Sequence, residues 1–190
     1  LTNLRDYFSG KHYIPHFYMA SLGSLEKAWE RYKEISYAEG SRAGTIDIEG
    51  SVLEQLGKEI KNIDDIRAKV EEAEKDKVHA TSHILEIVFA GAIAIDASDI
   101  HFEPEEHTVR LRFRLDGVLQ EVTDIAPEIH KYLNSRMKLL AGVKITSQAI
   151  AQDGRFSIMM GDDEISVRVS LIPGAYGESI VMRILNPKSI

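Results

Sequence analysis

The chain has 190 residues, of which 30 are acidic and 23 are basic, so its formal net charge is −7. This balance argues against a nonspecific nucleic-acid binder, whose affinity comes largely from lysines and arginines that neutralise phosphates. The hydrophobic fraction of 44% is typical of a globular protein, and the lack of cysteine excludes disulfides and thiolate metal sites and fits a reducing cytoplasm.

The first part of the chain predicts the end of one domain. Within residues 1–36, an aromatic segment at Tyr13–Tyr18 indicates a short strand, and the apolar residues that follow recur at helical spacing. Ser24 is the expected N-cap of that helix. We interpret residues 1–36 as the tail of a domain that begins earlier.

Residues 37–77 are interpreted as a linker, because glycines interrupt any apolar periodicity at its start. Two weak helices are expected in it, at 52–60 and 64–76. The second helix carries many charges and is expected to have one solvated face.

A compact domain is expected from residue 78 to residue 188. It begins with a buried helix, Val78–Ile95, whose apolar part contains Glu86 and is too short for the roughly 20 residues of a membrane span. We therefore expect a soluble, intracellular protein. Strands follow at 99–103, 109–115 and 118–123, and Asp116-Gly117 predicts a type I′ turn between the last two.

The second half of this domain repeats the pattern. Pro127 begins a helix that Gly142 ends. Three further strands are expected at 155–160, 164–171 and 178–185, with Gly161-Asp162 as a turn. A helix, three strands, a helix and three strands predict an α+β domain with a mostly antiparallel sheet and packing helices.

The strand at 109–115 carries the strongest candidate for chemistry. Side chains alternate along a strand, so Val109, Leu111, Phe113 and Leu115 should face the core. The three arginines Arg110, Arg112 and Arg114 then share the other face, where a guanidinium can hold phosphate by two parallel hydrogen bonds.

A two-residue turn predicts the partners of these arginines across the hairpin. It places Arg112 opposite Glu121, Arg110 opposite Thr123, and Arg114 opposite Leu119. Arg112 is therefore the best candidate for a cross-strand salt bridge. Arg114 has no evident local partner, which leaves its donors for an anion from elsewhere. The alternative is that the arginines form an ordinary solvated surface.

Two further clusters are weaker candidates. Asp99, His101 and Glu103 alternate onto one strand face, where hydrogen bonding at a domain or subunit boundary, shared with Arg110, is favoured over metal binding. Gln152–Arg155 (QDGR) indicates a turn that enters a strand. The sequence contains no phosphate-binding loop of the form GxxxxGK[ST], no GxSxG and no HExxH, so no self-sufficient active site is expected.

Five segments together resemble the ATPases of type II secretion and type IV pilus assembly. They occur in the order and spacing of that family, and the match covers about residues 78–188. Residues 22–32 resemble more loosely the last helix of the family's preceding, N1-type domain. The segments are Ala97–Pro104 (ASDIHFEP), Arg112–Leu119 (RFRLDGVL), Gln152–Arg155 (QDGR), Val167–Ser170 (VRVS) and Gly177–Ile184 (GESIVMRI).

The resemblance implies a PAS-like N2 domain at residues 78–188, followed by a RecA-like ATPase domain that would lie beyond residue 190 and bind ATP and Mg²⁺. It implies a cytoplasmic homo-hexamer at the inner face of the cell membrane, docked on inner-membrane platform proteins, with membrane association only through those partners. It also implies that arginines of the PAS-like domain contact the γ-phosphate of the nucleotide. The matching positions are Arg112 and Arg114, with Arg136 and Arg155 as further candidates.

The chain departs from the family pattern at residues 146–151, which are uncharged and lack proline where the family has a charged stretch. Two other functions are alternatives to a region of a secretion ATPase. A free-standing PAS-like ligand-binding or interaction module would need a cavity. An RNA-binding sheet would need exposed aromatic residues, and Phe113 is expected in the core.

Overall fold

A computed structural model describes residues 19–27, 45–47, 50–76, 80–160 and 163–185 of the chain. The chain divides into two units, Leu1–Ser36 and Tyr37–Ile190. In the first unit, residues 22–27 are helical, and the backbone N–H of Ser24 donates to Oγ of Ser21 at 3.2 Å. Ser21 therefore caps this helix in place of Ser24, and the strand expected at Tyr13–Tyr18 lies outside the described residues.

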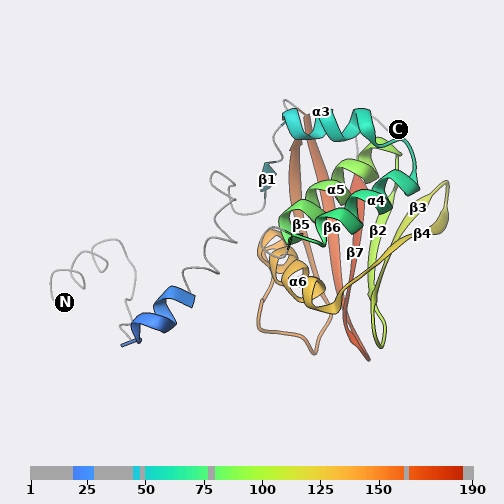
Figure 1. The fold of residues 1–190 in the computed structure, drawn as a ribbon. Helices are drawn as coiled ribbons and strands as arrows, with labels where there is room; N and C mark the ends of the chain where they lie inside the picture. Colours follow the sequence, from blue (N-terminus) through green and yellow to red (C-terminus); the bar gives the residue numbers. More distant parts are fainter. Residues whose placement is uncertain (1–18, 28–44, 48–49, 77–79, 161–162, 186–190) are drawn as a thin grey trace. The chain divides into compact units, whose positions relative to one another are not determined.

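The second unit contains one seven-stranded sheet with helices packed on it (Figure 1). Its helices are α3 (Gly50–Glu59), α4 (Ile63–Ala73), α5 (Ala80–Ala94) and α6 (Pro127–Ala141). Its strands are β1 (Thr45–Asp47), β2 (Asp99–Pro104), β3 (Val109–Leu115), β4 (Val118–Ile125), β5 (Gln152–Met160), β6 (Asp163–Gly174) and β7 (Gly177–Leu185).

The strand order is β1-β5-β6-β7-β2-β3-β4. Strands β2-β3-β4 and β5-β6-β7 are two antiparallel meanders, and the antiparallel pairing of β2 with β7 joins them into one sheet. Strand β1 adds to the edge in parallel with β5. The predicted α+β fold with a mostly antiparallel sheet is therefore confirmed.

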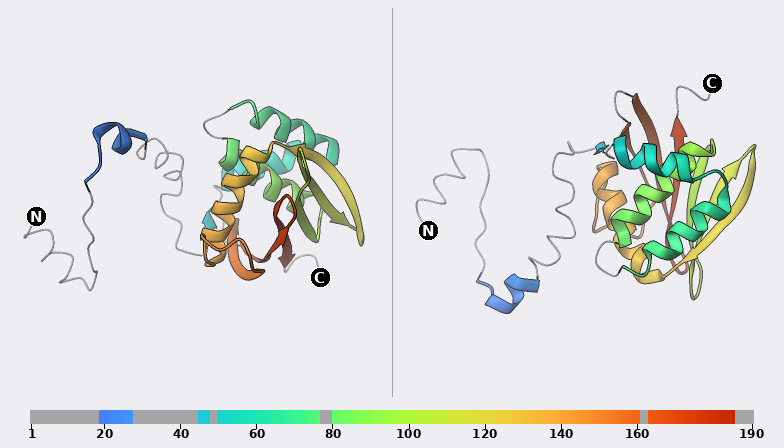
Figure 2. Two further views of the ribbon diagram at one scale, coloured as in Figure 1. Left: turned by 90° about the horizontal axis from the view of Figure 1, so that it is seen from below. Right: turned by 45° about the horizontal axis from the view of Figure 1, so that its top comes forward.

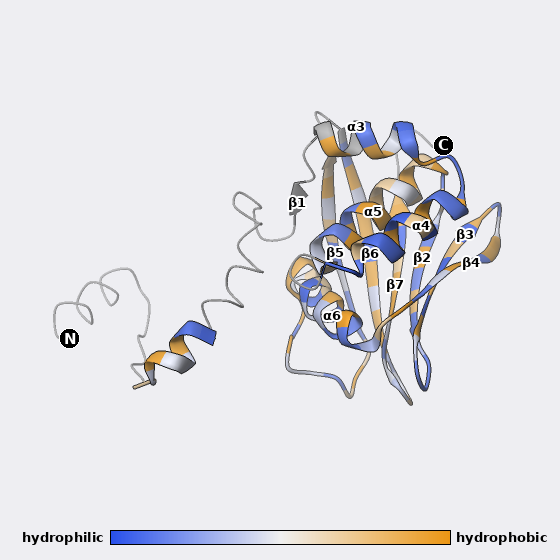
Figure 3. Cartoon of the chain, in the orientation of Figure 1, coloured by the Kyte–Doolittle hydropathy of each residue, from blue (hydrophilic) through white to orange (hydrophobic). Residues whose placement is uncertain are grey.

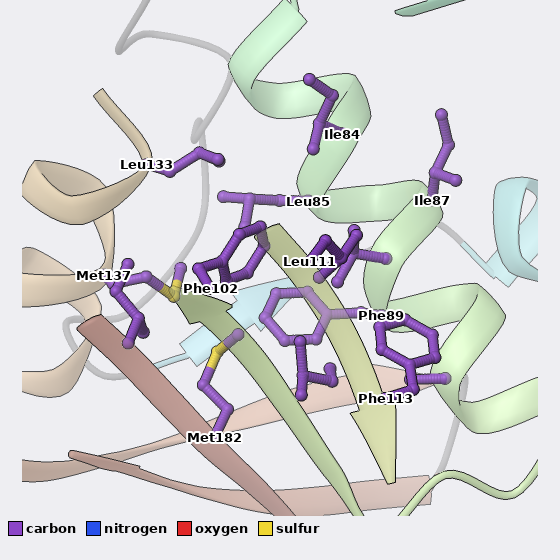
Figure 4. Packing of buried hydrophobic residues seen from close by; sticks show 14 of the residues in the cluster. Ile84, Leu85, Ile87, Phe89, Phe102, Leu111, Phe113, Leu133, Met137 and Met182 are labelled. Atoms are coloured by element: carbon purple, nitrogen blue, oxygen red, sulfur yellow. The ribbon is translucent and has the colours of Figure 1, made fainter. Parts of the chain in front are cut away.

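The helices lie on one face of the sheet, and the core lies between the two layers (Figures 1 and 2). Figure 3 shows hydrophobic residues along the strands behind the helices. Figure 4 shows Phe89 of α5 among Phe102, Leu111 and Phe113 of the sheet. Each of these four side chains is fully buried, which is where most of the hydrophobic stabilisation arises.

Helices α3 and α4 form as the sequence predicted, and α4 contributes to this core. Ile66 and Val70 have no exposed surface, and a Cβ on Gly91 of α5 would lie 2.8 Å from the Ile66 side chain. The segment 37–77, interpreted from the sequence as a linker, thus also contains β1 and a helix that packs tightly on α5. The many charged residues of α4 made the sequence look solvated, although Ile66 and Val70, one helical turn apart, form the buried face that packs on α5.

The turns that shape the sheet follow their sequence signals. Asp116 and Gly117 have φ values of 49° and 80°, as a type I′ turn requires. Gly142 ends α6 with φ 69° and donates to the carbonyls of Leu139 and Lys138. Strand β5, however, begins at Gln152 rather than at Arg155, so the QDGR segment lies in the strand and is not a turn. The turn expected at Gly161-Asp162 lies outside the described residues.

Candidate functional site

The sheet face turned away from the helices, called the open face here, carries the arginines that the sequence singled out. Along β3, Val109, Leu111 and Phe113 are buried against the helices, as predicted, and Leu115 is half-buried. Arg110, Arg112 and Arg114 alternate with them and keep about a third of each side chain exposed. Because Phe113 is buried, β3 offers no aromatic ring from that position for base stacking.

Arg110 is enclosed by carboxylates. Its guanidinium lies 3.2 Å from Glu105, 3.7 Å from Glu121 and 3.6 Å from Asp124. The expected partner Thr123 is wrong, because a register shift at Leu111/Arg112 pairs Arg110 with Asp124. An extra residue in one strand, a β-bulge, has this effect on every pair beyond it.

Arg112 lies opposite Glu121, as predicted, but its ion pair is made elsewhere. It donates from Nη2 to Oε2 of Glu103 on β2. The other oxygen of Glu103 lies 3.2 Å from Nδ1 of His101. The expected Arg112–Glu121 salt bridge is therefore replaced by one between β3 and β2.

Arg114 also has local partners, contrary to the sequence-based expectation. Its Nε lies 3.2 Å from Oδ2 of Asp99, and its Nη1 donates to the carbonyl of Gly117 at 3.0 Å. The hairpin argument considered only β4, whereas Asp99 pairs with Arg114 from β2, the strand on the other side.

Asp99 binds two arginines from the strands that flank it. Its side chain is 5% exposed; Oδ1 accepts from Nε of Arg183 at 2.8 Å, and Oδ2 accepts from Oγ of Ser98 at 2.9 Å. Burial by itself raises the pKa of Asp99, but the hydrogen bonds from Arg183 and Ser98 and the charges of Arg183 and Arg114 outweigh it. The pKa of this carboxyl is therefore lowered, and Asp99 is ionised at neutral pH.

Three arginines form a line across the other half of the open face, and we call them the arginine row: Arg155, Arg168 and Arg183. Arg155 pairs in register with Arg168, and Arg168 with Arg183. Asp99 and Arg114 continue the same line onto β2 and β3. Two of the predicted residues, Arg155 and Arg114, thus lie at the two ends of one line across the sheet.

Arg168 and Arg183 were not among the residues predicted from the sequence. Their signal is the alternation in Val167-Arg-Val and Met182-Arg-Ile, whose apolar members are buried. That alternation places each arginine on the open face. Only the pairing of the strands places the two beside each other.

Arg136 is not brought together with the other predicted arginines. It lies on α6 in the helical layer and donates to Oγ of Ser82 on α5 at 3.0 Å. Burial lowers its pKa, and the charge of Glu86 opposes that effect. The sheet separates this side chain from the open face.

The helical side holds two other polar features. A surface depression of about 300 Å³ between α3, α4 and α5 is bordered by the Glu59–Lys69 ion pair. Beneath α6, Nζ of Lys138 lies 2.6 Å from Oε2 of Glu178, and both side chains are almost fully buried. Neither feature reaches the arginine row.

Within the parts of the chain that the structure describes, no cluster of three or more His, Asp or Glu side chains could hold a metal ion. No described helix combines the length and the apolar character needed to cross a membrane.

Comparison with known proteins gives a consistent family assignment. The family model for type II/IV secretion system proteins matches residues 73–190. The type IV pilus assembly ATPase PilB of Myxococcus xanthus is 36% identical over 176 residues, which cover 90% of this chain and 29% of that protein.

Two type II secretion proteins are also similar. The type II secretion system protein E of Klebsiella pneumoniae is 33% identical over 87% of this chain and 33% of its own length. The type II secretion system ATPase E of Vibrio cholerae is 41% identical over 54% of this chain and 20% of its own length. The chain thus spans about a third or less of each of these relatives.

Proposed function

Because the chain belongs to the type II/IV secretion system protein family, we propose that it is the region of a secretion or pilus-assembly ATPase that supplies arginines to the nucleotide of a separate ATP-hydrolysing domain. In this proposal Arg114 and Arg155 face the phosphates, with Arg112 beside them. Arg136 is left out, because it lies in the helical layer. The region would couple ATP hydrolysis to the assembly of a pilus or pseudopilus.

The observation that carries the proposal is the single line that joins Arg155 to Arg114 across the open face. Asp99 holds Arg114 and Arg183 at its two oxygens, in each case through Nε. Such contacts fix the orientation of a guanidinium before a ligand arrives, which reduces the entropy lost on binding. Arginines that meet a transferring phosphoryl group stabilise its charge.

The proposal includes an organisation for the whole protein. Residues 1–36 would be the tail of a preceding domain and residues 78–188 a PAS-like domain, with α3 and α4 packed on its first helix. Asp99, His101, Glu103 and Arg110 would lie at a boundary with another domain or subunit. ATP and Mg²⁺ would be bound by the ATP-hydrolysing domain, in a cytoplasmic homo-hexamer docked on platform proteins of the inner membrane.

The 190-residue chain alone is expected to lack ATPase activity. A phosphate loop supplies backbone N–H groups that surround the phosphates, and the sequence contains no such loop. Phosphate release above background by the purified chain, unchanged after repurification, would contradict this expectation.

The test uses the full-length protein with Arg114→Ala, Arg114→Lys and Arg155→Ala. Loss of an arginine that meets the transferring phosphoryl group is expected to lower the ATPase rate on the order of a thousandfold for Arg114→Ala. The lysine variant should recover only part of the rate, because an ammonium group cannot reproduce the planar fork of a guanidinium.

Oligomeric state and melting temperature are measured for each variant, so that a folding defect is recognised. Arg67→Ala serves as the control, since Arg67 lies on α4 and bonds to Asp64 and to the carbonyl of Val122. Near-normal turnover by a folded, correctly assembled Arg114→Ala protein would refute the proposal for Arg114.

A further inference from the structure

We propose that strand β1 is a detachable latch on the edge of β5, through which the chain before residue 45 acts on the sheet. β1 contains three residues, Thr45–Asp47, and pairs in parallel with residues 157–159 of β5 (Figure 1). The latch itself is independent of the proposed function. Its effect on ATP hydrolysis rests on that function, and separate measurements test the two.

The pairing between β1 and β5 is short. It joins three residue pairs, whereas β5 and β6 are joined by nine. It is also the one parallel pairing among the described strands, and parallel ladders are slightly less stable per residue than antiparallel ones. As an edge strand, β1 has a hydrogen-bonded neighbour on one side only. We therefore expect β1 to open at a lower cost in free energy than the other strands of the described sheet.

The element that follows β1 is held by the core. Residues 48–49 join β1 to α3, and Val52 and Leu56 of α3 pack against the hydrophobic core. A displacement of the chain before residue 45 therefore reaches β1 first, and α3 resists it. This arrangement confines the movement to the three residues of β1, as a latch requires.

Strand β5 is held differently along its length. At Gly154, a Cβ would lie 2.4 Å from the backbone oxygen of Ala141, so the end of α6 packs closely on this part of the strand. Farther along, Ile158 is fully buried, and its backbone lies between β6 on one side and β1 on the other. Release of β1 would leave the backbone groups of residues 157–159 that face it without strand partners. This end of β5 would then be a free edge of the sheet.

The end of β5 that the latch covers is continuous with the open face. Ser157, the register partner of Thr45, donates from Oγ to Oε1 of Glu164 on β6 at 2.6 Å. Alternation places Ser157 and Arg155, two residues apart on the strand, on the same face of the sheet. Backbone at an open edge moves more than backbone that is paired on both sides. Release of β1 is therefore expected to loosen the position of Arg155.

Hydrogen exchange of the 190-residue chain, followed by NMR, tests whether β1 is a latch. Ile46→Pro removes the backbone N–H in the middle of β1, and proline interrupts a strand ladder. The amides of residues 157–159 that face β1 are expected to exchange at least tenfold faster in this variant. The amides of β6 and α5 should keep their parent rates. Ala20→Pro, which lies in the first unit and outside the sheet, is the matched control and should change none of these rates.

Asp47→Val provides the opposite expectation. Aspartate is depleted in strands and valine is enriched, so this variant should favour the docked strand and slow the exchange of the same amides about threefold or more. In the full-length protein, Ile46→Pro and Asp47→Val are expected to change the ATPase rate at least threefold, in opposite directions, because one releases the latch and the other strengthens it. Ala20→Pro should leave the rate unchanged. Circular dichroism establishes that each variant is folded.

The inference is overturned if Ile46→Pro leaves the exchange of residues 157–159 unchanged, because β1 would then not protect β5. It is also overturned if the amides of β6 and α5 accelerate equally, which would make β1 a part of the cooperative fold. Equal ATPase rates for the parent and the two β1 variants, or changes in the same direction, would refute the control of β5 by the latch.

These outcomes differ from those that test the proposed function. Hydrogen exchange is measured without a nucleotide, so normal turnover by a full-length Arg114→Ala protein leaves the exchange result intact. Unchanged exchange in Ile46→Pro likewise leaves the result for Arg114 intact.

Discussion

Arg183 donates from Nε to Oδ1 of Asp99 at 2.8 Å, from strand β7 to strand β2. These are the two strands that join the β5-β6-β7 meander to the β2-β3-β4 meander. The other oxygen of Asp99 lies 3.2 Å from Nε of Arg114 on β3. One carboxylate therefore joins both halves of the open face, because it contacts Arg183 of the arginine row and Arg114 of β3.

Asp99→Asn is expected to lower the free energy of unfolding at pH 7 by about 1.5–3 kcal/mol, the usual range for hydrogen bonds to charged groups. The pKa of Asp99 is lowered in the folded protein. The contribution of its ion pairs to stability is therefore complete at a pH above 3.8, the ordinary pKa of the group, and is lost as the pH falls through the pKa of the folded state. The difference between the variant and the parent should therefore shrink below about pH 4. Urea denaturation at pH 7 and pH 3 measures it.

Asp116→Asn is the matched control for this experiment. Asp116 is exposed in the type I′ turn with φ 49°, a conformation that asparagine also tolerates. Its substitution should change the unfolding free energy little at either pH. If Asp99→Asn costs as much at pH 3 as at pH 7, the ion pairs to Arg114 and Arg183 are not the source of its effect.

The sequence correctly predicted the features of β3 and its hairpin that depend only on neighbouring residues. Alternation along β3 indicated which side chains are buried, and Asp116-Gly117 determined the hairpin and its first four pairs. The partner of Arg110 could not be predicted, because the bulge that shifts its register leaves no sequence signal. The partner of Arg114 could not be predicted either, because Asp99 comes from a strand outside the hairpin.

The arginine row could not be predicted from the sequence, because it also depends on pairing between strands. Each of its members sits at an alternating position that indicates the open face. Their proximity depends on the register between β5, β6 and β7, and a slip by one residue would move a side chain to the other face. Register is set by packing across the whole sheet, so local patterns reveal the face of each arginine but not its neighbours.

Phe113→Ala and Arg114→Ala should separate the two faces of β3. Phe113 has no exposed surface, so its truncation is expected to cost about 3–5 kcal/mol of unfolding free energy. Arg114 keeps 34% of its side chain exposed, so losing its contact with Asp99 should cost about 1 kcal/mol or less. Urea denaturation of both variants measures the difference, and equal costs would contradict the assignment of faces.

Gly154→Ala is expected to destabilise the protein by about 1–3 kcal/mol, the usual cost of overpacking. A Cβ at this position would lie 2.4 Å from the backbone oxygen of Ala141, at the end of α6. Backbone cannot rotate away as a side chain can, so α6 or β5 must move. This close approach explains why QDGR has a glycine at position 154 although the segment does not form a turn.

Gly57→Ala provides the opposite expectation with the same chemical change. Gly57 lies in α3, and nothing described lies within 4 Å of a Cβ added there. Alanine favours helix over glycine by up to about 1 kcal/mol, so this variant should be slightly stabilised. Thermal denaturation of the two variants compares them directly; a stabilised Gly154→Ala would show that α6 does not approach β5 this closely.

The buried pair Lys138–Glu178 gives the last prediction. Lys138 is 1% and Glu178 5% exposed, and Oε2 of Glu178 also accepts from Nδ2 of Asn134 at 2.7 Å. Lys138→Met leaves an uncompensated carboxylate beneath α6, and Glu178→Met leaves an uncompensated ammonium group. Each single change is therefore expected to cost about 3–5 kcal/mol.

The double variant Lys138→Met/Glu178→Met should cost much less than the sum of the two single changes, because it removes both charges together and replaces them with adaptable apolar side chains. Nζ of Lys138 also donates to the carbonyl of Ser147 at 2.6 Å, so some cost remains in the double variant, from the loop that precedes β5. Urea denaturation of the four proteins in the cycle gives the coupling energy. A large favourable coupling identifies an ion pair that is needed only because both charges are present. Additive costs would mean that each side chain is held by separate contacts, Lys138 by Ser147 and Glu178 by Asn134.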